Sequence, residues 1–334
     1  MGKVRWSPGC VRPSGLVVPV RAGRDITHSE ARRRAWRNVG PGWYVDDAAA
    51  ADAVEQRILE QSVRLPTPGA VTGWAALRWR GAAFFDGRAD GGRTELPVPL
   101  LVGVGNIRGD RRVAISKEQL PPDEREIIDG VPCTVAERAV FDEMRRTRNL
   151  NISVAAVDMA AAAGLVSVES MAAYILHRPA WTGVPHARKA LALSTDDSRS
   201  PQETRMRLVW VIDARLPPPL CNQPIFGPDG SLLGEPDLFD PAAGVVGEYD
   251  GAHHLEDDQR RADRDREECF RDHGLEYFAV VIGELGDRAR VATRMRRAHS
   301  RAVQRGTTGW RWTLEQPDWY AGYRRSRDRH AHLA

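Results

Sequence analysis

Acidic side chains crowd into the segment "EPDLFDPAAGVVGEYDG" (residues 235–251), which otherwise has the pattern of two short strands joined by the turn "PAAG". If that turn has four residues, Asp237 faces Glu248 in an antiparallel pair. Side chains alternate along a strand, so Asp250 should lie on the same face as Glu248. The spacing therefore predicts that three carboxylates, Asp237, Glu248 and Asp250, converge.

Three carboxylates on one face of a sheet repel one another unless a cation neutralises them. Oxygen ligands suit Mg²⁺ or Mn²⁺ better than zinc, and such ions activate water and stabilise charge on a phosphoryl oxygen. The segment therefore predicts a Mg²⁺ or Mn²⁺ site at Asp237, Glu248 and Asp250. The alternative is that these are ordinary acids at strand ends, because a register slip of one residue would scatter them onto both faces.

Two histidines follow the second strand directly. Neutral imidazole titrates near working pH, so His253 or His254 could act as a general base. The spacing does not choose between them, and the alternative is that both are surface residues.

A glutamate stands at the start of the helix expected before these strands. In "SPQE" (residues 200–203), serine, proline at the first helical position and Glu203 make a capping box, which by itself accounts for the glutamate. The alternative is that the carboxylate of Glu203 leans towards the acidic cluster and takes part in its chemistry.

The helix expected after the strands carries polar side chains on the face that should dock on the sheet. Gln259, Asp263, Arg266 and Phe270 are spaced by four, three and four residues and so share one helical face. These polar residues then support the acidic site. The alternative is that Asp263 and Arg266 form an ordinary ion pair within the helix.

Arginines dominate the last predicted helix, in the segment "GDRARVATRMRRAHSRAVQR" (residues 286–305). They lie beside an apolar stripe that should pack on the sheet, and a row of one sign of charge predicts a surface that binds phosphates. The row consists of Arg290, Arg294, Arg297, Arg301 and Arg305. A second basic cluster, "ARRRAWR" ahead of "GPGWYV", suggests the remnant of a winged helix.

The chain has 334 residues, which favours two domains. The expected fold class is α+β or α/β. A mostly helical domain should span residues 1–193, a polar linker 194–200, a domain of helix, two hairpins, helix, strand and helix 201–315, and a loosely ordered tail 316–334. The helices expected in the first domain are 48–61, 72–80, 134–146, 153–163 and 186–193, with a capping box at Thr134 and Glu137.

Composition sets broad limits on the class of protein. The formal net charge of +3 is too small to indicate a partner, and the four cysteines form no CxxC pair, which argues against a structural zinc site or a disulfide framework. The chain contains no apolar run of the length of a signal peptide or a transmembrane helix. We therefore expect a cytoplasmic protein with no membrane association.

The downstream half resembles a known family through five motifs in order. These are "SPQETRMRL", "PDL", "EYDGAHH", the set Asp263, Arg266, Phe270 and Gly274, and "LEYFAVV". Over residues 198 to roughly 310 the chain resembles the small domain related to very-short-patch-repair endonucleases, in the PD-(D/E)xK nuclease superfamily. The resemblance implies a restriction-endonuclease-like αβββαβ fold and metal-dependent cleavage of phosphodiester bonds.

The same resemblance implies roles for individual residues. Asp237 matches the aspartate of the "PD" motif, Glu248 the second acidic position, and Glu203 the helix glutamate that some members add. The lysine expected two residues after Glu248 is Asp250 here, so the site lacks the usual ammonium group. That substitution places more of the catalytic task on the metal ion and on a histidine.

The upstream half resembles, less closely, the region that precedes this domain in actinobacterial proteins and is similar to AbiEi-type antitoxins. The residues that carry this likeness are "ITHSEARRRAWRNVGPGWYV", "GWAALRWRG" and "GVPCTVAERAVFDE". The resemblance implies a winged helix that binds DNA. Taken together, the motifs predict a metal-dependent endonuclease acting on DNA, in which Arg266 and the arginine row bind phosphates. The alternative is a non-catalytic DNA-binding regulator of antitoxin type that keeps a degenerate nuclease fold.

Overall fold

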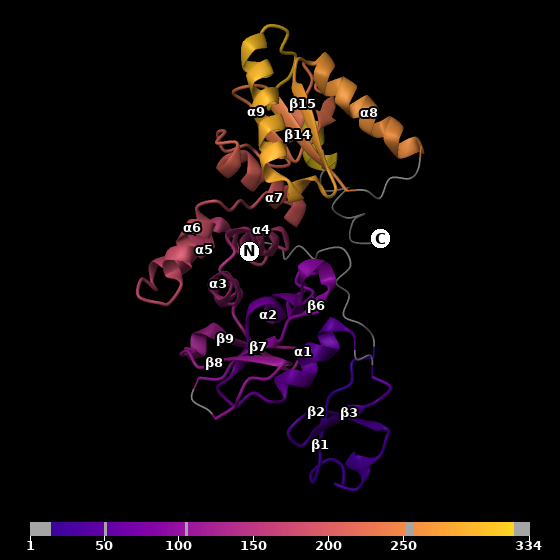
Figure 1. The fold of residues 1–334 in the computed structure, drawn as a ribbon, viewed down its shortest axis with the longest axis vertical. Coiled ribbons are helices and arrows are strands. Elements are labelled where there is room, and N and C mark those ends of the chain that lie inside the picture. The colour runs from indigo at the N-terminus through magenta and orange to yellow at the C-terminus, as the bar shows by residue number, and fades with distance from the viewer. Residues whose placement is uncertain (1–14, 50–51, 104–105, 252–256, 324–334) are drawn as a thin grey trace. The chain divides into compact units, whose positions relative to one another are not determined.

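The computed structural model describes residues 15–49, 52–103, 106–251 and 257–323, with the backbone alone for 90 and 257–263. The chain divides into two compact units, Met1–Ala192 and Leu193–Ala334, close to the boundary expected from sequence (Figure 1). The segment expected as a linker belongs to the second unit, where Ser198 is buried and its hydroxyl lies 3.1 Å from that of Thr204.

The first unit begins with a small antiparallel sheet of order β1-β3-β2. Its elements are β1 (Val20–Arg21), the 3₁₀ turn η1 (Glu30–Arg32), β2 (Trp36–Gly40) and β3 (Trp43–Asp46). The basic cluster expected as a helix is thus a 3₁₀ turn followed by a strand, because the backbone becomes extended at Arg33. Of a winged helix, this described segment contains a hairpin, β2–β3, preceded by a single 3₁₀ turn in place of a helix.

A five-stranded sheet of order β8-β7-β4-β10-β9 forms the centre of the first unit. Its strands are β4 (Ala70–Val71), β7 (Val98–Leu101), β8 (Val113–Ser116), β9 (Arg125–Ile128) and β10 (Val131–Thr134). Strands β7 and β8 are parallel, as are β4 and β10. The expectation of a mostly helical domain is therefore wrong, and this unit mixes helices and strands. Each strand has at most four residues, too few for an alternating pattern to stand out.

Helices pack against this sheet, and two further short strands, β5 (Arg88–Ala89) and β6 (Thr94–Glu95), form a hairpin around η2 (Asp90–Gly92). The other elements are α1 (Val54–Ser62), α2 (Gly73–Trp79), η3 (Pro122–Glu124), α3 (Ala136–Arg146), α4 (Leu150–Ala162), α5 (Val168–Leu176) and α6 (Val184–Leu191). The capping box expected at Thr134 is not formed, because α3 begins after Val135 and the Thr134 hydroxyl donates to Thr72 Oγ1 at 3.2 Å.

A buried arginine connects α3 to its surroundings. Arg138 is fully buried and donates to Asp142 at 3.0 Å, to Glu124 at 2.8 Å and to Glu118 at 3.1 Å. A charge in such a place is tolerated only because carboxylates surround it. This ion network holds α3 to the segments that precede it in the chain.

The second unit contains a three-stranded sheet of order β13-β14-β15, in which β14 is antiparallel to β13 and parallel to β15. Its elements are α7 (Pro201–Leu208), the π-helical turn η4 (Val209–Asp213), β11 (Ile225–Phe226), β12 (Leu232–Gly234), β13 (Leu238–Asp240), β14 (Val245–Asp250), α8 (Asp257–Asp272), β15 (Glu276–Val281), η5 (Glu284–Gly286) and α9 (Arg288–Arg305). Strands β11 and β12 pair separately. The order of elements agrees with the expected one.

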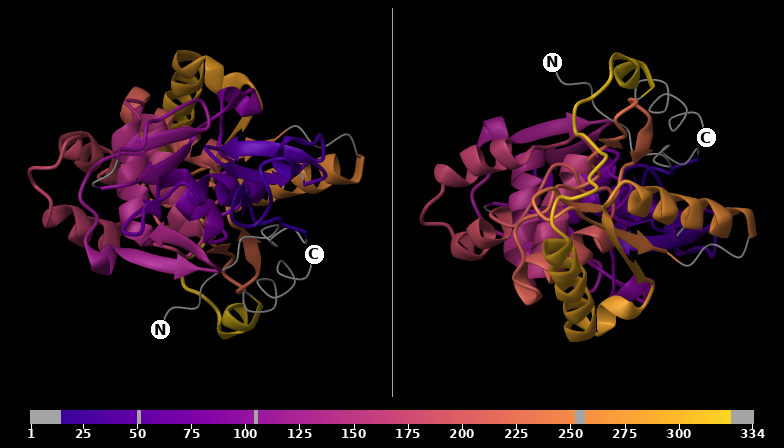
Figure 2. Two further views of the ribbon diagram at one scale, coloured as in Figure 1. Left: turned by 90° about the horizontal axis from the view of Figure 1, so that it is seen from below. Right: turned by 90° about the horizontal axis from the view of Figure 1, so that it is seen from above.

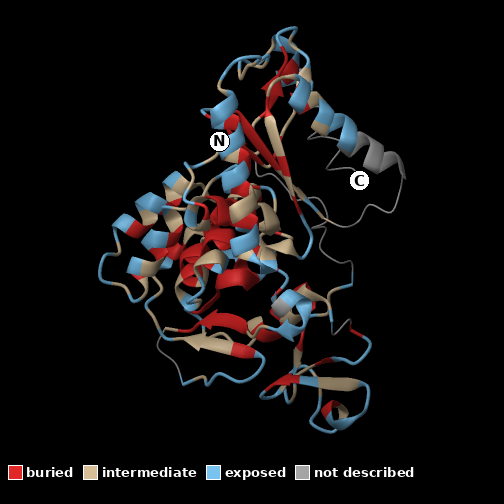
Figure 3. Cartoon of the chain, turned by 45° about the horizontal axis from the view of Figure 1, so that its top comes forward, coloured by how far each residue is buried: buried red, intermediate tan, exposed pale blue. Residues whose placement is uncertain are grey.

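Helices α8 and α9 cover opposite faces of this sheet, and α8 extends beyond its end (Figures 1 and 2). On the α9 face, Val245 and Phe278 pack with Met295. On the α8 face, Phe239 and Val246 pack with Phe270. Figure 3 shows buried residues along the strands and exposed ones along the outer side of α9.

One glycine is required at the centre of the sheet. A Cβ atom on Gly247 would lie 2.2 Å from Cζ of Phe278, far inside contact distance. The Phe278 ring fills that space and stacks on Trp210, with ring centroids 5.7 Å apart. The missing side chain of Gly247 therefore lets two aromatic rings pack beneath α9.

The segment that follows α9 packs against other elements of the second unit. Residues 318–323 form a helical turn, and Tyr320 is only 1% exposed, with its ring 5.0 Å from that of Phe226. The tail expected to be loosely ordered from 316 is therefore packed in its first part. Trp319 and Tyr320, adjacent in sequence, both contact the Phe226 ring and provide an apolar contact that the charged composition of the tail does not indicate.

The outer edge of β15 is covered by an ion pair. Glu284 accepts the Val281 N–H at 3.0 Å, and Arg294 donates to the Ala279 carbonyl at 2.6 Å. The same two side chains bind each other at 2.5 and 2.7 Å. We call this pair the edge clasp, because it occupies backbone groups that point away from β14.

No helix among the described residues is both long and apolar enough to cross a bilayer.

Candidate active site

The register of β13 and β14 brings the acidic residues together. Leu238 pairs with Gly247 and Asp240 with Val245, so the next pair outward is Asp237 with Glu248, as the four-residue turn predicts. Since Phe239 and Val246 face α8, alternation places Asp237, Glu248 and Asp250 on that same face. The spacing argument therefore gives the observed face for all three carboxylates.

Asp237 has an unusual electrostatic environment. One carboxylate oxygen accepts the Tyr249 N–H at 2.7 Å. Burial, followed by the neighbouring carboxylates of Glu203 and Glu248, raises the pKa of Asp237 to about 7, against the opposing effects of the Tyr249 N–H and of Arg199. An aspartate in this state is uncharged for much of the time near neutral pH unless a cation joins it.

Glu203 lies in the first turn of α7, where the serine half of the expected capping box is formed, while its own carboxylate bonds the N–H of Arg199 in place of that of Ser200. Its backbone N–H donates to Ser200 Oγ at 3.2 Å, which caps the helix. Its carboxylate accepts the Arg199 N–H and the Asn222 side-chain amide, both at 2.8 Å. Because this carboxylate raises the pKa of Asp237 more than Glu248 does, Glu203 is a full member of the cluster.

Glu248 is held by two donors from the α8 face. Arg266 donates to one carboxylate oxygen at 3.3 Å and the Tyr277 hydroxyl to the other at 3.1 Å. Burial and the charge of Glu248 raise the pKa of Tyr277, so its hydroxyl stays protonated as a donor. Asp250, two residues further along β14, is exposed.

Two half-exposed arginines flank the carboxylates. Arg266 approaches Glu248, and its side chain is 47% exposed. Arg199 pairs with Glu235 at 2.8 Å with its side chain 48% exposed, and its charge acts on Asp237. Such exposed cations beside a carboxylate cluster suit the oxygens of a phosphate group.

Sequence reasoning missed three of the residues at this site, namely Arg199, Asn222 and Tyr277. Arg199 directly precedes the helix cap at Ser200, and that position was the signal available for it. Asn222 donates to Glu203 from a left-handed backbone conformation, φ 49°, and Tyr277 comes from the strand of the motif "LEYFAVV". No local sequence pattern indicates the contact of Asn222 with Glu203 or that of Tyr277 with Glu248.

Several predicted residues fall in parts of the chain whose placement the structure does not give. His253 and His254 lie outside the described residues, so the general base stays a prediction. Gln259 and Asp263 belong to the backbone of α8, and their side chains are outside the described part as well.

The arginine row lies on α9, on the sheet face opposite the carboxylates. Arg294 is used by the edge clasp, while Arg301 and Arg305 bind Glu276 at 2.8 and 3.0 Å. The side chains of Arg290 and Arg297 form no hydrogen bond with any described residue. The row is thus partly neutralised by carboxylates, and the charge of Arg290 also helps to lower the pKa of Glu284.

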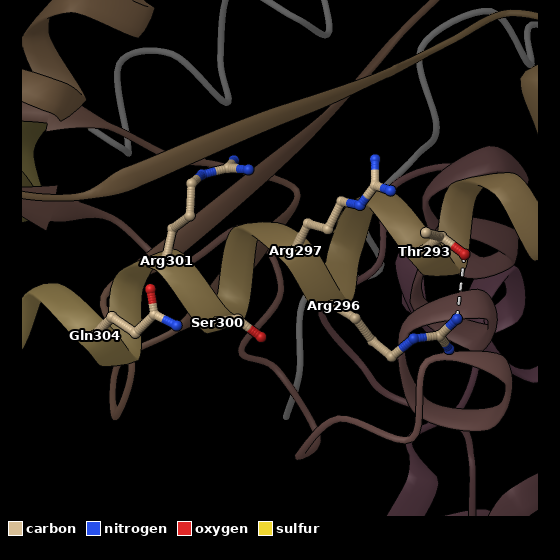
Figure 4. Close-up of a pocket in the computed structure, with 6 residues that line it drawn as sticks. All are labelled: Thr293, Arg296, Arg297, Ser300, Arg301 and Gln304. Carbon is tan, nitrogen blue, oxygen red and sulfur yellow. Dashed lines mark hydrogen bonds between the residues drawn. The ribbon is translucent and has the colours of Figure 1, made fainter.

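A shallow surface hollow of about 600 Å³ follows this row, with a second of about 350 Å³ beside it, shown in Figure 4. In the close-up, Arg297 and Arg301 extend on one side of α9, whereas Arg296 turns back to Thr293 Oγ1 at 3.2 Å. The larger hollow is lined by Asp287, Ala289, Arg290, Thr293, Arg294, Arg297 and Arg301.

The donor atoms of the cluster suit a hard divalent cation. One oxygen of Glu203 and one of Asp237 accept no hydrogen bond from the described residues, and every candidate ligand is a carboxylate. Among those residues, no group of three or more Asp, Glu, His and Cys side chains already adopts a metal-holding arrangement. Glu203 and Asp237 thus each keep one carboxylate oxygen for a cation, whereas both oxygens of Glu248 already accept hydrogen bonds, from Arg266 and Tyr277.

Comparisons of the chain with protein-family models, with curated proteins and with solved structures find no match.

Proposed function

We propose that the second unit is a metal-dependent endonuclease with a restriction-endonuclease-like fold that hydrolyses phosphodiester bonds in DNA. The observation that carries this proposal is the gathering of Glu203, Asp237 and Glu248, which raises the pKa of Asp237 to about 7. Neighbouring carboxylates raise one another's pKa unless a cation neutralises them, and strongly shifted pKa values cluster at functional sites. The resemblance to very-short-patch-repair endonucleases supports the same activity.

Each residue of the cluster has a role in this proposal. Asp237 and Glu203 hold Mg²⁺ or Mn²⁺, with Glu248 and Asp250 as further oxygen donors, and the bound ion supplies positive charge for water activation and for the phosphoryl oxygens. Arg266, half-exposed beside Glu248, would bind a phosphate oxygen. His253 or His254 removes a proton from the attacking water.

DNA is the proposed partner of both units. In the first unit, the hairpin β2–β3 follows the exposed basic residues 32–34, as in the wing of a DNA-binding domain. In the second unit, Arg290 and Arg297 offer free donors to the backbone of a strand. We expect these contacts to depend on salt, because they release counterions from the phosphates.

The test is a cleavage assay on plasmid and short duplex DNA with Mg²⁺ or Mn²⁺. Wild-type protein should cut, and Asp237→Asn and Glu203→Gln should each lose roughly 100-fold or more of the rate, because each removes charge at the reacting phosphate. The matched control is Asp272→Asn, which removes a charge at an exposed position of α8 and should leave the rate unchanged. Cleavage that survives both site substitutions would show that these carboxylates are not the catalytic ones.

The alternative function is a non-catalytic DNA-binding regulator of antitoxin type. Two observations favour it: the position of the usual lysine is occupied by Asp250, and Glu248 is already held by Arg266 and Tyr277. In that case wild type and both variants bind DNA equally in a salt-sensitive way, and none of them cuts.

A further inference from the structure

Two large aromatic side chains are exposed on the helical turn 318–323. Trp319 is 47% exposed and Tyr323 is 42% exposed. They are four residues apart and so stand on one side of the turn, with ring centroids 5.9 Å apart. We call Trp319 and Tyr323 the aromatic pair. Aromatic rings exposed side by side leave apolar surface in contact with water, and a ligand that stacks on them would cover it.

The turn that carries the aromatic pair is firmly anchored. Tyr320 is buried against Phe226 and its hydroxyl donates to Glu235 at 2.7 Å. The Trp319 indole N–H donates to the Gly230 carbonyl at 3.2 Å. Since the only hydrogen-bonding group of the indole is already used, the exposed part of Trp319 offers ring surface to a ligand and no polar contact.

The same anchor connects the aromatic pair to the carboxylate cluster. Glu235 accepts the Tyr320 hydroxyl and also binds the guanidinium of Arg199. Glu235 lies two residues before Asp237, and the N–H of Arg199 donates to Glu203. One carboxylate therefore fixes the aromatic turn to both segments that supply the proposed metal ligands.

We propose that the aromatic pair is a stacking platform for an unpaired base of a DNA strand whose phosphate backbone passes Arg199. This inference rests on the proposed function and narrows its substrate to DNA with a single-stranded segment beside the scissile bond. Every base has a π-face, so stacking on aromatic rings recognises single strands without sequence preference. The guanidinium of Arg199, half-exposed beside its partner Glu235, supplies the cation that such a strand needs, and an apolar protein partner would make no use of that charge.

The test measures DNA binding separately from cleavage. Fluorescence anisotropy would follow a labelled 15-nucleotide single strand and a blunt duplex of the same sequence, in EDTA, with full-length protein carrying Asp237→Asn. Adding Trp319→Ala should weaken single-strand binding about 10-fold and duplex binding less than 2-fold, in line with the loss of one stacked base.

Two further variants keep this test independent of folding defects. Trp319→Phe retains a ring and should restore single-strand binding to within about 3-fold. Phe84→Ala removes an exposed aromatic ring in the first unit and should change neither affinity. Equal weakening of single-strand and duplex binding by Trp319→Ala, or no weakening at all, overturns the platform.

The outcome is distinguishable from failure of the nuclease proposal. If wild-type protein does not cut but the single-strand effect of Trp319→Ala is observed, the platform stands and the endonuclease does not. If wild-type protein cuts and Trp319→Ala binds single strands normally, the endonuclease stands and the aromatic pair has another partner, such as a protein surface.

Discussion

Replacement of Asp237 by asparagine should make the protein more stable at alkaline pH when no divalent cation is present. In the folded protein the pKa of Asp237 is about 7, whereas its ordinary value is 3.8. Between these values the folded state holds a proton that the unfolded state has lost, so the free energy of unfolding falls as pH rises from about 4 to 7. Asparagine does not titrate, so the free energy of unfolding of the variant does not fall for this reason as pH rises.

The size of the effect follows from the same two values. At about 1.36 kcal/mol for each pH unit, the gap between 3.8 and about 7 corresponds to a ceiling of about 4 kcal/mol. Asp237 is only partly buried, and solvent screening reduces this to about 2 kcal/mol. The asparagine oxygen can still accept the Tyr249 N–H, so this hydrogen bond is kept in the variant.

Urea denaturation at pH 5 and pH 8.5 in EDTA measures the prediction. The advantage of Asp237→Asn over wild type should grow by about 1 kcal/mol or more between the two pH values, while Asp272→Asn shows no such trend. Addition of Mg²⁺ or Mn²⁺ at pH 8.5 should stabilise wild type and leave Asp237→Asn unchanged. An advantage that is the same at both pH values would refute the raised pKa and the electrostatic argument for the site.

Two further predictions concern the packing of each unit. Arg138→Met should destabilise the first unit by about 3 kcal/mol, measured by urea denaturation, because it removes the fully buried cation that the carboxylates of Asp142 and Glu124 share and leaves Arg145 and Arg178 as their remaining cations; a loss below 1 kcal/mol would contradict the role of the ion network. Gly247→Ala should cost about 1–3 kcal/mol through the clash with Phe278, measured by thermal denaturation, whereas Gly286→Ala, where a Cβ meets no atom within 4 Å, should cost well under 1 kcal/mol.

The candidate site was largely predictable because its core is local in sequence. A four-residue turn sets the register of β13 and β14, and period-two alternation then fixes the common face of Asp237, Glu248 and Asp250. The sequence did not show whether Glu203 belongs to the carboxylate cluster. Its local role as part of a helix start explains the residue fully, and only the packing of α7 beside β14 brings its carboxylate to Asp237.

The parts that sequence reasoning missed depend on contacts between distant elements. The central sheet of the first unit is built from strands of two to four residues, which carry too little pattern to separate them from loops. The arginine row has the periodicity expected for α9, but Glu276 and Glu284 come from β15 and the turn after it. Helical spacing shows which arginines share a face and does not show which carboxylates from other elements meet them.

The edge clasp gives Arg294 a different importance from the one its place in the row suggested. A β-sheet can be extended by another strand at either edge. Strand β15 is an edge strand of its three-stranded sheet, so its outward-pointing N–H and C=O groups could pair with an extended segment of another chain. Glu284 and Arg294 occupy the Val281 N–H and the Ala279 carbonyl as a neighbouring strand would. Two side chains thus set the width of the sheet, and Arg294 closes the edge of β15 to an extended segment of a second copy of the chain.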